Sequence, residues 1–271
     1  MFRIVFHKVF IIHDKLCRQG LFYFNVYGTG TTSIVYEDHY KYDKYQKGDL
    51  RMYTGNYECL ELFVKPDEGK KGSVLLKNVK ESTTETKELK HIYGNWIKFP
   101  VSRNTEYEIS TQDCTITFAY LSECENIMEN GICVLDTTDN YKEMNKEEFL
   151  HFIDTPYREQ YHFSPVVNWN NDPNGLCWFK GYYHLFYQMN PFGQEWNNMY
   201  WGHAASKDLV HWTHLPVVLE PQEEILDNLA IKGGAFSGSA LPMGDEMYFY
   251  LTRHIGPQDD GWETIQYQTM T

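Results

Sequence analysis

The sequence predicts an all-β protein built from two β-rich regions. Short apolar runs alternate with polar residues, turn residues recur about every ten positions, and no long helical segment separates the strands of either region. Residues 1–140 are expected to form an accessory domain of the β-sandwich type, residues 141–158 a helical linker, and residues 159–271 a second β-rich domain.

The first region contains runs with a period of two that end at turn residues. Its predicted strands cover residues 60–64, 73–76, 96–99 and 115–120. Ile116, Phe118 and Tyr120 would share one face of the last of them. No catalytic constellation occurs here, so a bracing domain is the simplest interpretation. A sugar-binding module stays open as an alternative, because Trp96 and the many tyrosines could offer stacking surfaces.

A change of composition marks the boundary between the two regions. Residues 141–150 are rich in charge and poor in β-branched side chains, and Asp139 or Asn140 could cap a helix that starts there. The linker is therefore placed at residues 141–158.

The second region begins with a hairpin signal. Apolar runs at 178–180 and 182–187 flank Gly181. Further strands are predicted at 199–204, 215–219 and 247–251. Short strands in this style favour a sandwich, barrel or propeller over βαβ units.

Composition and charge exclude some classes of partner. The formal net charge is −13, from 24 basic and 37 acidic residues. This balance argues against a nucleic-acid groove and against docking to an anionic membrane. A neutral small molecule remains compatible. Aromatic residues make up 16% of the chain, which suits either sugar stacking or sheet packing.

The six cysteines form no C-x-x-C pair, so neither a zinc site nor a redox site is predicted, and the thiols are expected to be reduced. No run of about 18 apolar residues occurs, and no small-residue cleavage site follows the N-terminal segment. A cytoplasmic location is the expectation.

The run Trp-Asn-Asn-Asp-Pro-Asn-Gly at residues 169–175 carries the strongest chemical signal. It places Asp172 in what the composition predicts to be a turn, with aromatic residues on both sides. A held carboxylate with aromatic walls suits sugar hydrolysis, where it meets positive charge developing on the ring. Taken alone, however, Asp-Pro-Asn-Gly is a common turn whose Asp caps the backbone.

Further runs occur in a fixed order along the second region. They are His162-Phe163-Ser164-Pro165, Asn171-Asp172-Pro173-Asn174-Gly175, His184-Leu185-Phe186-Tyr187-Gln188, Asn190-Pro191, Trp196, Trp201-Gly202-His203-Ala204, Asp208-Leu209-Val210-His211-Trp212 and Phe236-Ser237-Gly238-Ser239-Ala240. Together they resemble the opening signature of glycoside hydrolase family 32, which contains invertases, sucrose-6-phosphate hydrolases, levanases and inulinases. The resemblance covers roughly 110 residues, which at roughly 40 to 45 residues per blade make about two propeller blades and a little.

The resemblance implies a five-bladed β-propeller and a retaining mechanism on β-fructofuranosides. Asp172 would be the nucleophile, a Glu the acid and then the base, and a second Asp, in an Arg-Asp-Pro motif, would hold sugar hydroxyls. No metal and no organic cofactor is implied. Gln188 and Ser237 would contact the sugar, and Trp196 and Phe236 would form apolar walls beside it. From the residues themselves, Asn171 is the amide neighbour expected to hold Asp172 by a hydrogen bond.

Structural interpretations compete at each of these positions. Gln188 could be a satisfied core amide, and Trp196 and Phe236 could be ordinary packing. His203 and His211 are expected to be structural. In the same way, Asp208 is expected to cap a turn, and Glu195 is a spare carboxylate with no expected catalytic role.

Two positions depart from the family pattern. Asn170 stands where the family usually carries an apolar residue, and Asn168 stands where Gly is frequent. Both changes could alter the outer edge of the site, and thereby substrate choice, without touching Asp172.

No Arg-Asp-Pro and no Glu-Cys pair follows Asp172 in the sequence. The expectation is a truncated chain whose acid/base Glu lies beyond Thr271, so that the 271 residues alone hydrolyse no sucrose. A non-catalytic fructoside-binding protein is the main alternative. An enzyme of related fold that inverts configuration or transfers fructose to an acceptor is a third.

Overall fold

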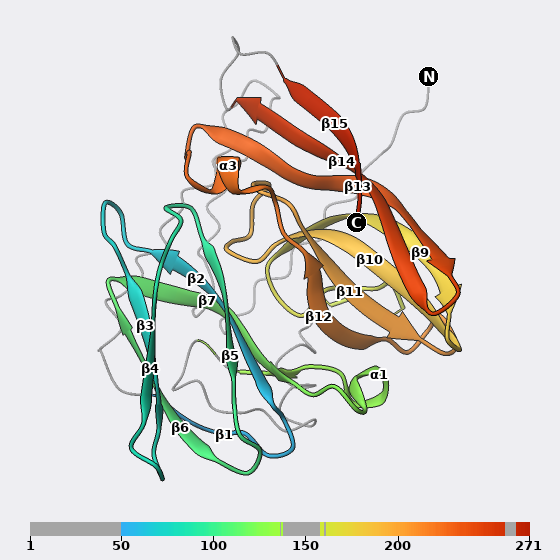
Figure 1. Cartoon of the computed structure of the whole chain (residues 1–271). Helices are drawn as coiled ribbons and strands as arrows, with labels where there is room; N and C mark the ends of the chain where they lie inside the picture. Colours follow the sequence, from blue (N-terminus) through green and yellow to red (C-terminus); the bar gives the residue numbers. More distant parts are fainter. Residues whose placement is uncertain (1–49, 136, 138–157, 160, 258–263) are drawn as a thin grey trace, which may run out of the picture. The chain divides into compact units, whose positions relative to one another are not determined.

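The computed structural model describes residues 50–135, 137, 158–159, 161–257 and 264–271 (Figure 1). These residues all belong to the compact unit Lys47–Thr271. Residues 1–49 of the expected accessory domain and almost all of the expected helical linker at 141–158 lie outside the described residues.

Residues 50–134 form two four-stranded antiparallel sheets. One has the order β1 (Leu50–Tyr53), β6 (Glu106–Gln112), β3 (Ser73–Asn78) and β4 (Thr84–Glu88). The other has the order β5 (Asn95–Pro100), β2 (Cys59–Pro66), β7 (Cys114–Ser122) and β8 (Cys133–Val134). A short helix, α1 (Ile127–Asn130), precedes β8.

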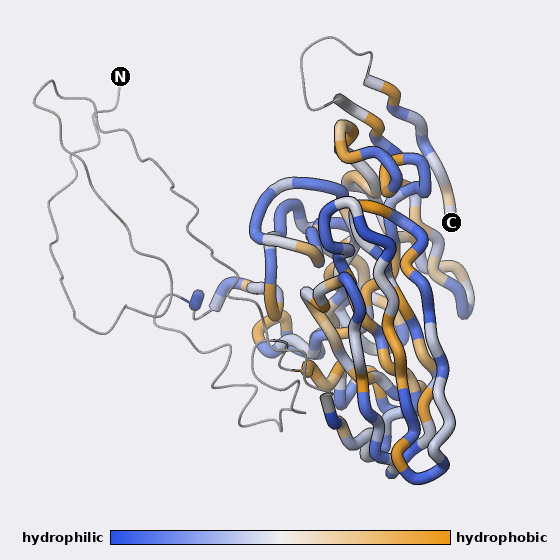
Figure 2. Tube along the Cα trace, turned by 90° about the vertical axis from the view of Figure 1, so that its left-hand side faces the viewer, coloured by the Kyte–Doolittle hydropathy of each residue, from blue (hydrophilic) through white to orange (hydrophobic). Residues whose placement is uncertain are grey.

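A single apolar core joins these two sheets. Leu60 and Leu62 of β2 pack with Val74 of β3 and Ile109 of β6, and none of these side chains is exposed to solvent. Along β3, buried and half-buried residues alternate, as a strand with one covered face requires. Figure 2 shows the resulting alternation of apolar and polar residues along the strands. The period of two in the sequence thus marks residues that face this core.

The second region starts with a four-stranded antiparallel meander. Its order is β12 (Thr213–Leu219), β11 (Tyr200–Ser206), β10 (Tyr182–Asn190) and β9 (Trp169–Phe179). The β9–β10 hairpin turns through Lys180 and Gly181, with φ of 46° and 86°. Two consecutive positive φ values are typical of the tight turn whose twist matches a hairpin, as the sequence predicts.

A second antiparallel sheet follows the short helix α3 (Glu223–Leu226). It has the order β13 (Ile231–Met243), β14 (Glu246–Pro257) and β15 (Ile265–Met270). Strand β9 passes close to β13, since a Cβ on Gly175 would lie 3.1 Å from that of Ala240. The predicted all-β fold is confirmed, and the number of blades stays a prediction.

The sandwich sheets contact the first meander through aromatic side chains and one buried carboxylate. Glu61 accepts hydrogen bonds from Trp96 Nε1 (2.7 Å) and Tyr120 Oη (3.0 Å), and the backbone N–H of Val217 in β12 donates to Tyr120 Oη (3.2 Å). Trp96 also stacks on Phe63, with ring centroids 5.5 Å apart. Its indole is therefore held in packing rather than offered as a sugar platform.

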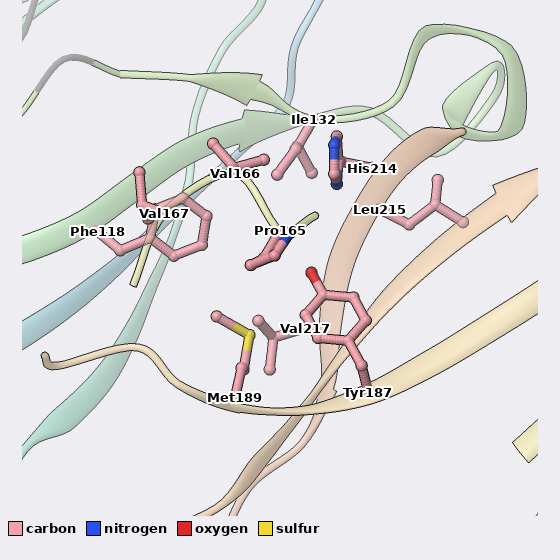
Figure 3. Close-up of a pocket in the computed structure, with 10 residues that line it drawn as sticks. All are labelled: Phe118, Ile132, Pro165, Val166, Val167, Tyr187, Met189, His214, Leu215 and Val217. Atoms are coloured by element: carbon pink, nitrogen blue, oxygen red, sulfur yellow. The ribbon is translucent and has the colours of Figure 1, made fainter. Parts of the chain in front are cut away.

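The apolar crevice in Figure 3 lies at this contact. Phe118 and Ile132 approach it from the sandwich side, and Tyr187 and Val217 from the meander. Its free volume is about 10 Å³, room for no more than one water molecule. The crevice is a packing defect between the two parts and is too small for a sugar.

Candidate active site

The run that contains Asp172 is not the turn that the sequence predicts; it lies inside strand β9. Tyr187 pairs with Pro173 and Met189 pairs with Asn170, so that Asn171 and Asp172 together face Gln188 of β10. Two residues opposite one make a β-bulge, and bulges redirect side chains at functional sites. Pro173 is tolerated because β9 is the edge strand of its sheet.

A second bulge interrupts β13. Ala235 pairs with Arg253 and Gly238 pairs with Leu251, which leaves Phe236 and Ser237 opposite the single residue Thr252. Because the bulge inserts one extra residue, the side chains of Phe236 and Ser237 do not follow the regular alternation between the two faces of the sheet.

The two bulges meet through a short chain of hydrogen bonds. Gln188 Nε2 donates to Ser237 Oγ (2.8 Å), and Ser237 Oγ donates to Asp172 Oδ2 (2.6 Å). Gln188 is 4% exposed, whereas Asp172 is exposed. A buried amide therefore orients a hydroxyl, the hydroxyl fixes one carboxylate oxygen, and the other oxygen, Oδ1, remains available to a ligand.

The predicted aromatic walls lie on neighbouring elements. Phe236 stacks on His254 with ring centroids 4.2 Å apart and planes 4° apart. Trp196, from the segment between β10 and β11, is 40% exposed, and Lys232 Nζ lies 5.8 Å from its ring centroid. Phe236 is thus fixed by a partner ring, while Trp196 keeps surface available to a ligand.

Asn171 is exposed, and the structure gives it no hydrogen bond to Asp172. The hydroxyl of Ser237, expected only as a sugar contact, supplies that bond instead. Asn171 as a substrate-site residue stays a prediction.

Comparison with known proteins shows what this part of the chain resembles. The model of the glycosyl hydrolases family 32 N-terminal domain matches residues 162–271. A solved glycoside hydrolase family 32 structure from Bifidobacterium adolescentis superposes on 82% of this chain with a TM-score of 0.74 and 34% sequence identity. Residues 162–271 belong to glycoside hydrolase family 32. The matched part makes up 37% of that solved chain.

Curated relatives are similar to part of this chain. A levanase from Bacillus subtilis is 56% identical over 90 residues, which are 33% of this chain and 12% of the levanase. A sucrose-6-phosphate hydrolase from Zymomonas mobilis is 38% identical over 125 residues, which are 46% of this chain and 23% of that protein. The chain therefore spans less than a quarter of either relative.

The family 32 region also contains a histidine pair that sequence reasoning missed. His184 Nε2 lies 3.2 Å from the carbonyl oxygen of Phe179, and His184 Nδ1 lies 2.9 Å from His203 Nε2. With Nε2 of His184 donating to the carbonyl, its Nδ1 accepts the proton of His203 Nε2. Burial lowers the pKa of His203 to about 3 and also lowers the pKa of His184. Both rings are neutral and serve in packing. The ring of His203 stacks on that of Phe186, with ring centroids 4.3 Å apart.

Asp208 and His211 form an exposed turn rather than an acid–base pair for the site. Asp208 Oδ1 accepts the backbone N–H groups of Val210 and His211, and Asp208 Oδ2 lies 2.7 Å from His211 Nδ1. Hydrogen bonds from the His211 ring and from these N–H groups hold the pKa of Asp208 well below its ordinary value. These contacts fit the structural role that the sequence indicates.

Asn168 has a positive φ of 66°, and its side chain donates to the carbonyl oxygen of Pro191 (2.8 Å). Asn and Gly are the residues that adopt this conformation at least cost, which explains why Asn can stand where the family often has Gly.

Within the described ranges, no group of three or more His, Cys, Asp or Glu side chains is arranged to hold a metal ion. The described cysteines, Cys59, Cys114, Cys124, Cys133 and Cys177, carry free thiols. None of the helices in the described part of the chain has the length and apolarity needed to cross a membrane.

Proposed function

We propose that this protein acts on β-fructofuranosides and that Asp172 is the nucleophile of a retaining double displacement. The hydrogen-bonded chain Gln188–Ser237–Asp172 carries the proposal, because it fixes one oxygen of an exposed carboxylate and leaves the other free. Membership of residues 162–271 in family 32 supports it, as do relatives described as a levanase and a sucrose-6-phosphate hydrolase.

The proposed first step is an attack of Asp172 Oδ1 on the anomeric carbon of the fructosyl unit. The bond to the leaving group breaks with its electron pair, and the carboxylate becomes a fructosyl ester. Ser237 stays hydrogen-bonded to Oδ2, which keeps the carboxylate in the plane of attack. Trp196 and Phe236 are proposed to flank the ring, and Gln188 to hold its hydroxyls.

A donor with an activated leaving group tests this step directly. β-Fructofuranosyl fluoride releases fluoride without needing a proton from a general acid, so the attack depends on the nucleophile alone. Incubation of the purified chain with this donor should add the mass of one fructosyl unit, and peptide mapping should place the addition on Asp172. The Asp172→Asn variant should gain no mass. Labelling at another residue, or equal labelling of the variant, would contradict the assignment.

A non-catalytic fructoside-binding protein is the second candidate function. The same reagent separates the candidates, because a binding protein would retain affinity for fructosides in calorimetry and yet form no ester with the fluoride.

A further inference from the structure

The Trp196 segment, residues 191–199, joins β10 to β11 and is attached to both strands that form the proposed site. The carbonyl oxygen of its Gly193 accepts a hydrogen bond from the first backbone N–H of β9 (3.0 Å). Near its other end, Oδ1 of Asn198 accepts a hydrogen bond from the backbone N–H of Gly233 in β13 (3.1 Å). Strand β9 carries the proposed nucleophile and β13 carries the hydroxyl that bonds it, so this segment borders the site from both sides.

A buried asparagine at the end of β10 fixes the conformation of the Trp196 segment. Asn190 is 1% exposed, and its Nδ2 donates to the carbonyl oxygen of Glu195 (3.0 Å), the residue directly before Trp196. Its Oδ1 accepts the backbone N–H of Phe192 (3.0 Å). One amide group therefore holds both halves of the segment, and the backbone that carries the indole depends on how this amide is oriented.

The sandwich supplies a further hydrogen bond to this asparagine. Tyr93, a buried residue between β4 and β5, donates its hydroxyl to Oδ1 of Asn190 (3.1 Å). Its ring meets that of Phe192 edge-on, with ring centroids 5.5 Å apart. The next residue, Gly94, has no room for a side chain, because a built Cβ would lie 2.6 Å from the Phe192 ring. The connection between β4 and β5 thus fits closely against the Trp196 segment.

The connection that carries Tyr93 is itself held in place. Oδ1 of Asn95 accepts the backbone N–H groups of Lys90 (2.8 Å) and His91 (3.0 Å), and its Nδ2 donates to the carbonyl oxygen of His91 (2.8 Å). The backbone N–H of Tyr93 donates to the carbonyl oxygen of Leu226 in α3 (3.0 Å). A hydroxyl on such a restrained backbone can orient the amide that it bonds.

We propose that Tyr93 is a positioning residue of the fructoside site, through which the sandwich sets the place of Trp196 and so the strength of sugar binding. The inference rests on the proposed function. The contacts run from Tyr93 to Asn190 and from Asn190 to the peptide group before Trp196. An indole held in place before the sugar arrives need not be ordered on binding, which lowers the entropic cost of association.

Labelling by β-fructofuranosyl fluoride, followed over a range of donor concentrations, separates binding from attack. In Tyr93→Phe the half-saturating concentration should rise roughly 2- to 10-fold, the effect of losing one neutral hydrogen bond. The maximal rate of labelling should stay unchanged, because Ser237 still holds Asp172. Gly94→Ala is a second variant that displaces the Trp196 segment from the sandwich side, and it should raise the half-saturating concentration in the same direction.

A double-mutant cycle with Trp196→Ala tests whether Tyr93 acts through the indole. Trp196→Ala alone should raise the half-saturating concentration, and the addition of Tyr93→Phe should raise it no further. A residue that only stabilises the fold would have the same effect with and without the indole.

Tyr120→Phe is the matched control. Tyr120 is also a buried tyrosine of the sandwich, but its hydroxyl bonds Glu61 and the backbone N–H of Val217. Its substitution should leave the half-saturating concentration unchanged. No rise in Tyr93→Phe, or an equal rise in the absence of the Trp196 indole, would overturn the positioning role and leave the fructoside site standing. Absence of labelling in the unaltered chain would instead contradict the proposed function and this inference with it.

Discussion

Ser237 and Asp172 are 65 positions apart, and the hydroxyl of the first lies 2.6 Å from a carboxylate oxygen of the second. Each residue is placed by a β-bulge, one in β13 and one in β9. A regular strand would alternate its side chains strictly between two faces, whereas the inserted residue lets each strand redirect one polar group toward the other. The site is therefore a product of two local irregularities in otherwise ordinary sheets.

Ser237→Ala tests whether this hydrogen bond matters for chemistry. The variant lacks the donor to Asp172 Oδ2, so the carboxylate is held less firmly. A hydrogen bond to a charged group is worth about 1.5–3 kcal/mol, so labelling by β-fructofuranosyl fluoride should slow by roughly 10- to 100-fold. Ser239→Ala, two residues along the same strand and exposed, should label at the unaltered rate. Equal rates for both variants would remove Ser237 from the mechanism.

Tyr120→Phe tests the contact between the sandwich and the first meander. The change removes a donor to the buried carboxylate of Glu61 and leaves the Val217 N–H without its acceptor. Leaving buried polar groups unsatisfied costs about 1–3 kcal/mol, which should appear as a lower free energy of unfolding in urea. Tyr53→Phe is the control, because Tyr53 is 50% exposed and bonds only the exposed Asn104. If both changes lowered the free energy of unfolding equally, the buried hydrogen bonds of Tyr120 would make no contribution to stability.

Much of the fold follows from the spacing of apolar residues. The segments predicted at 60–64, 73–76 and 96–99 lie within β2, β3 and β5. In β3 and β5 the alternation reports which side chains face the core, whereas β2 is buried on both faces. Strand β4 gives no such signal, because its residues Thr84–Glu88 are almost all exposed.

The candidate site was predictable as a set of residues but not as a geometry. Asp-Pro-Asn-Gly has the composition of a turn, and only the pairing of β9 with β10 turns it into a bulged edge strand. In the same way, nothing local to Ser237 indicates Asp172 as its acceptor. His184 and His203 bond across neighbouring strands, a contact that requires the strand register to be known.

The buried histidines predict how stability changes with pH. The folded-state pKa values of His203 and His214 are about 3 and about 4, both lowered chiefly by burial from an ordinary value of 6.5. Below pH 6.5 these two histidines therefore bind protons in the unfolded chain but stay neutral in the folded chain. The stabilisation is complete above that pH and is lost as the pH falls toward 4, with each histidine contributing up to about 1.4 kcal/mol per pH unit.

Urea unfolding between pH 7 and pH 5 measures this slope in a range where most carboxylates remain ionised. His203→Gln removes one titrating group, so its stability should fall less steeply with decreasing pH than that of the unaltered chain. If His203→Gln kept the slope of the unaltered chain, proton uptake by His203 on unfolding would be ruled out as a source of acid sensitivity.

Gly238→Ala tests the bulge in β13. A Cβ at this position would lie 2.0 Å from the carbonyl oxygen of Tyr250 and 2.8 Å from Leu251 Cα, and backbone atoms cannot yield as a flexible side chain can. Overpacking of this kind costs roughly 1–3 kcal/mol or more, and its relief would shift Ser237 away from Asp172. We therefore expect both a lower free energy of unfolding and a large loss of labelling by the fluoride.

Gly244→Ala separates the clash from the ordinary cost of replacing a glycine. Gly244 has a positive φ of 65° in the β13–β14 turn, with no atom within 4 Å of a built Cβ. Its replacement should cost only the strain of a left-handed residue, about 1–2 kcal/mol, and should leave labelling intact. If Gly238→Ala were as stable and as reactive as Gly244→Ala, the bulge could shift without consequence, and the alignment of Ser237 with Asp172 would not depend on it.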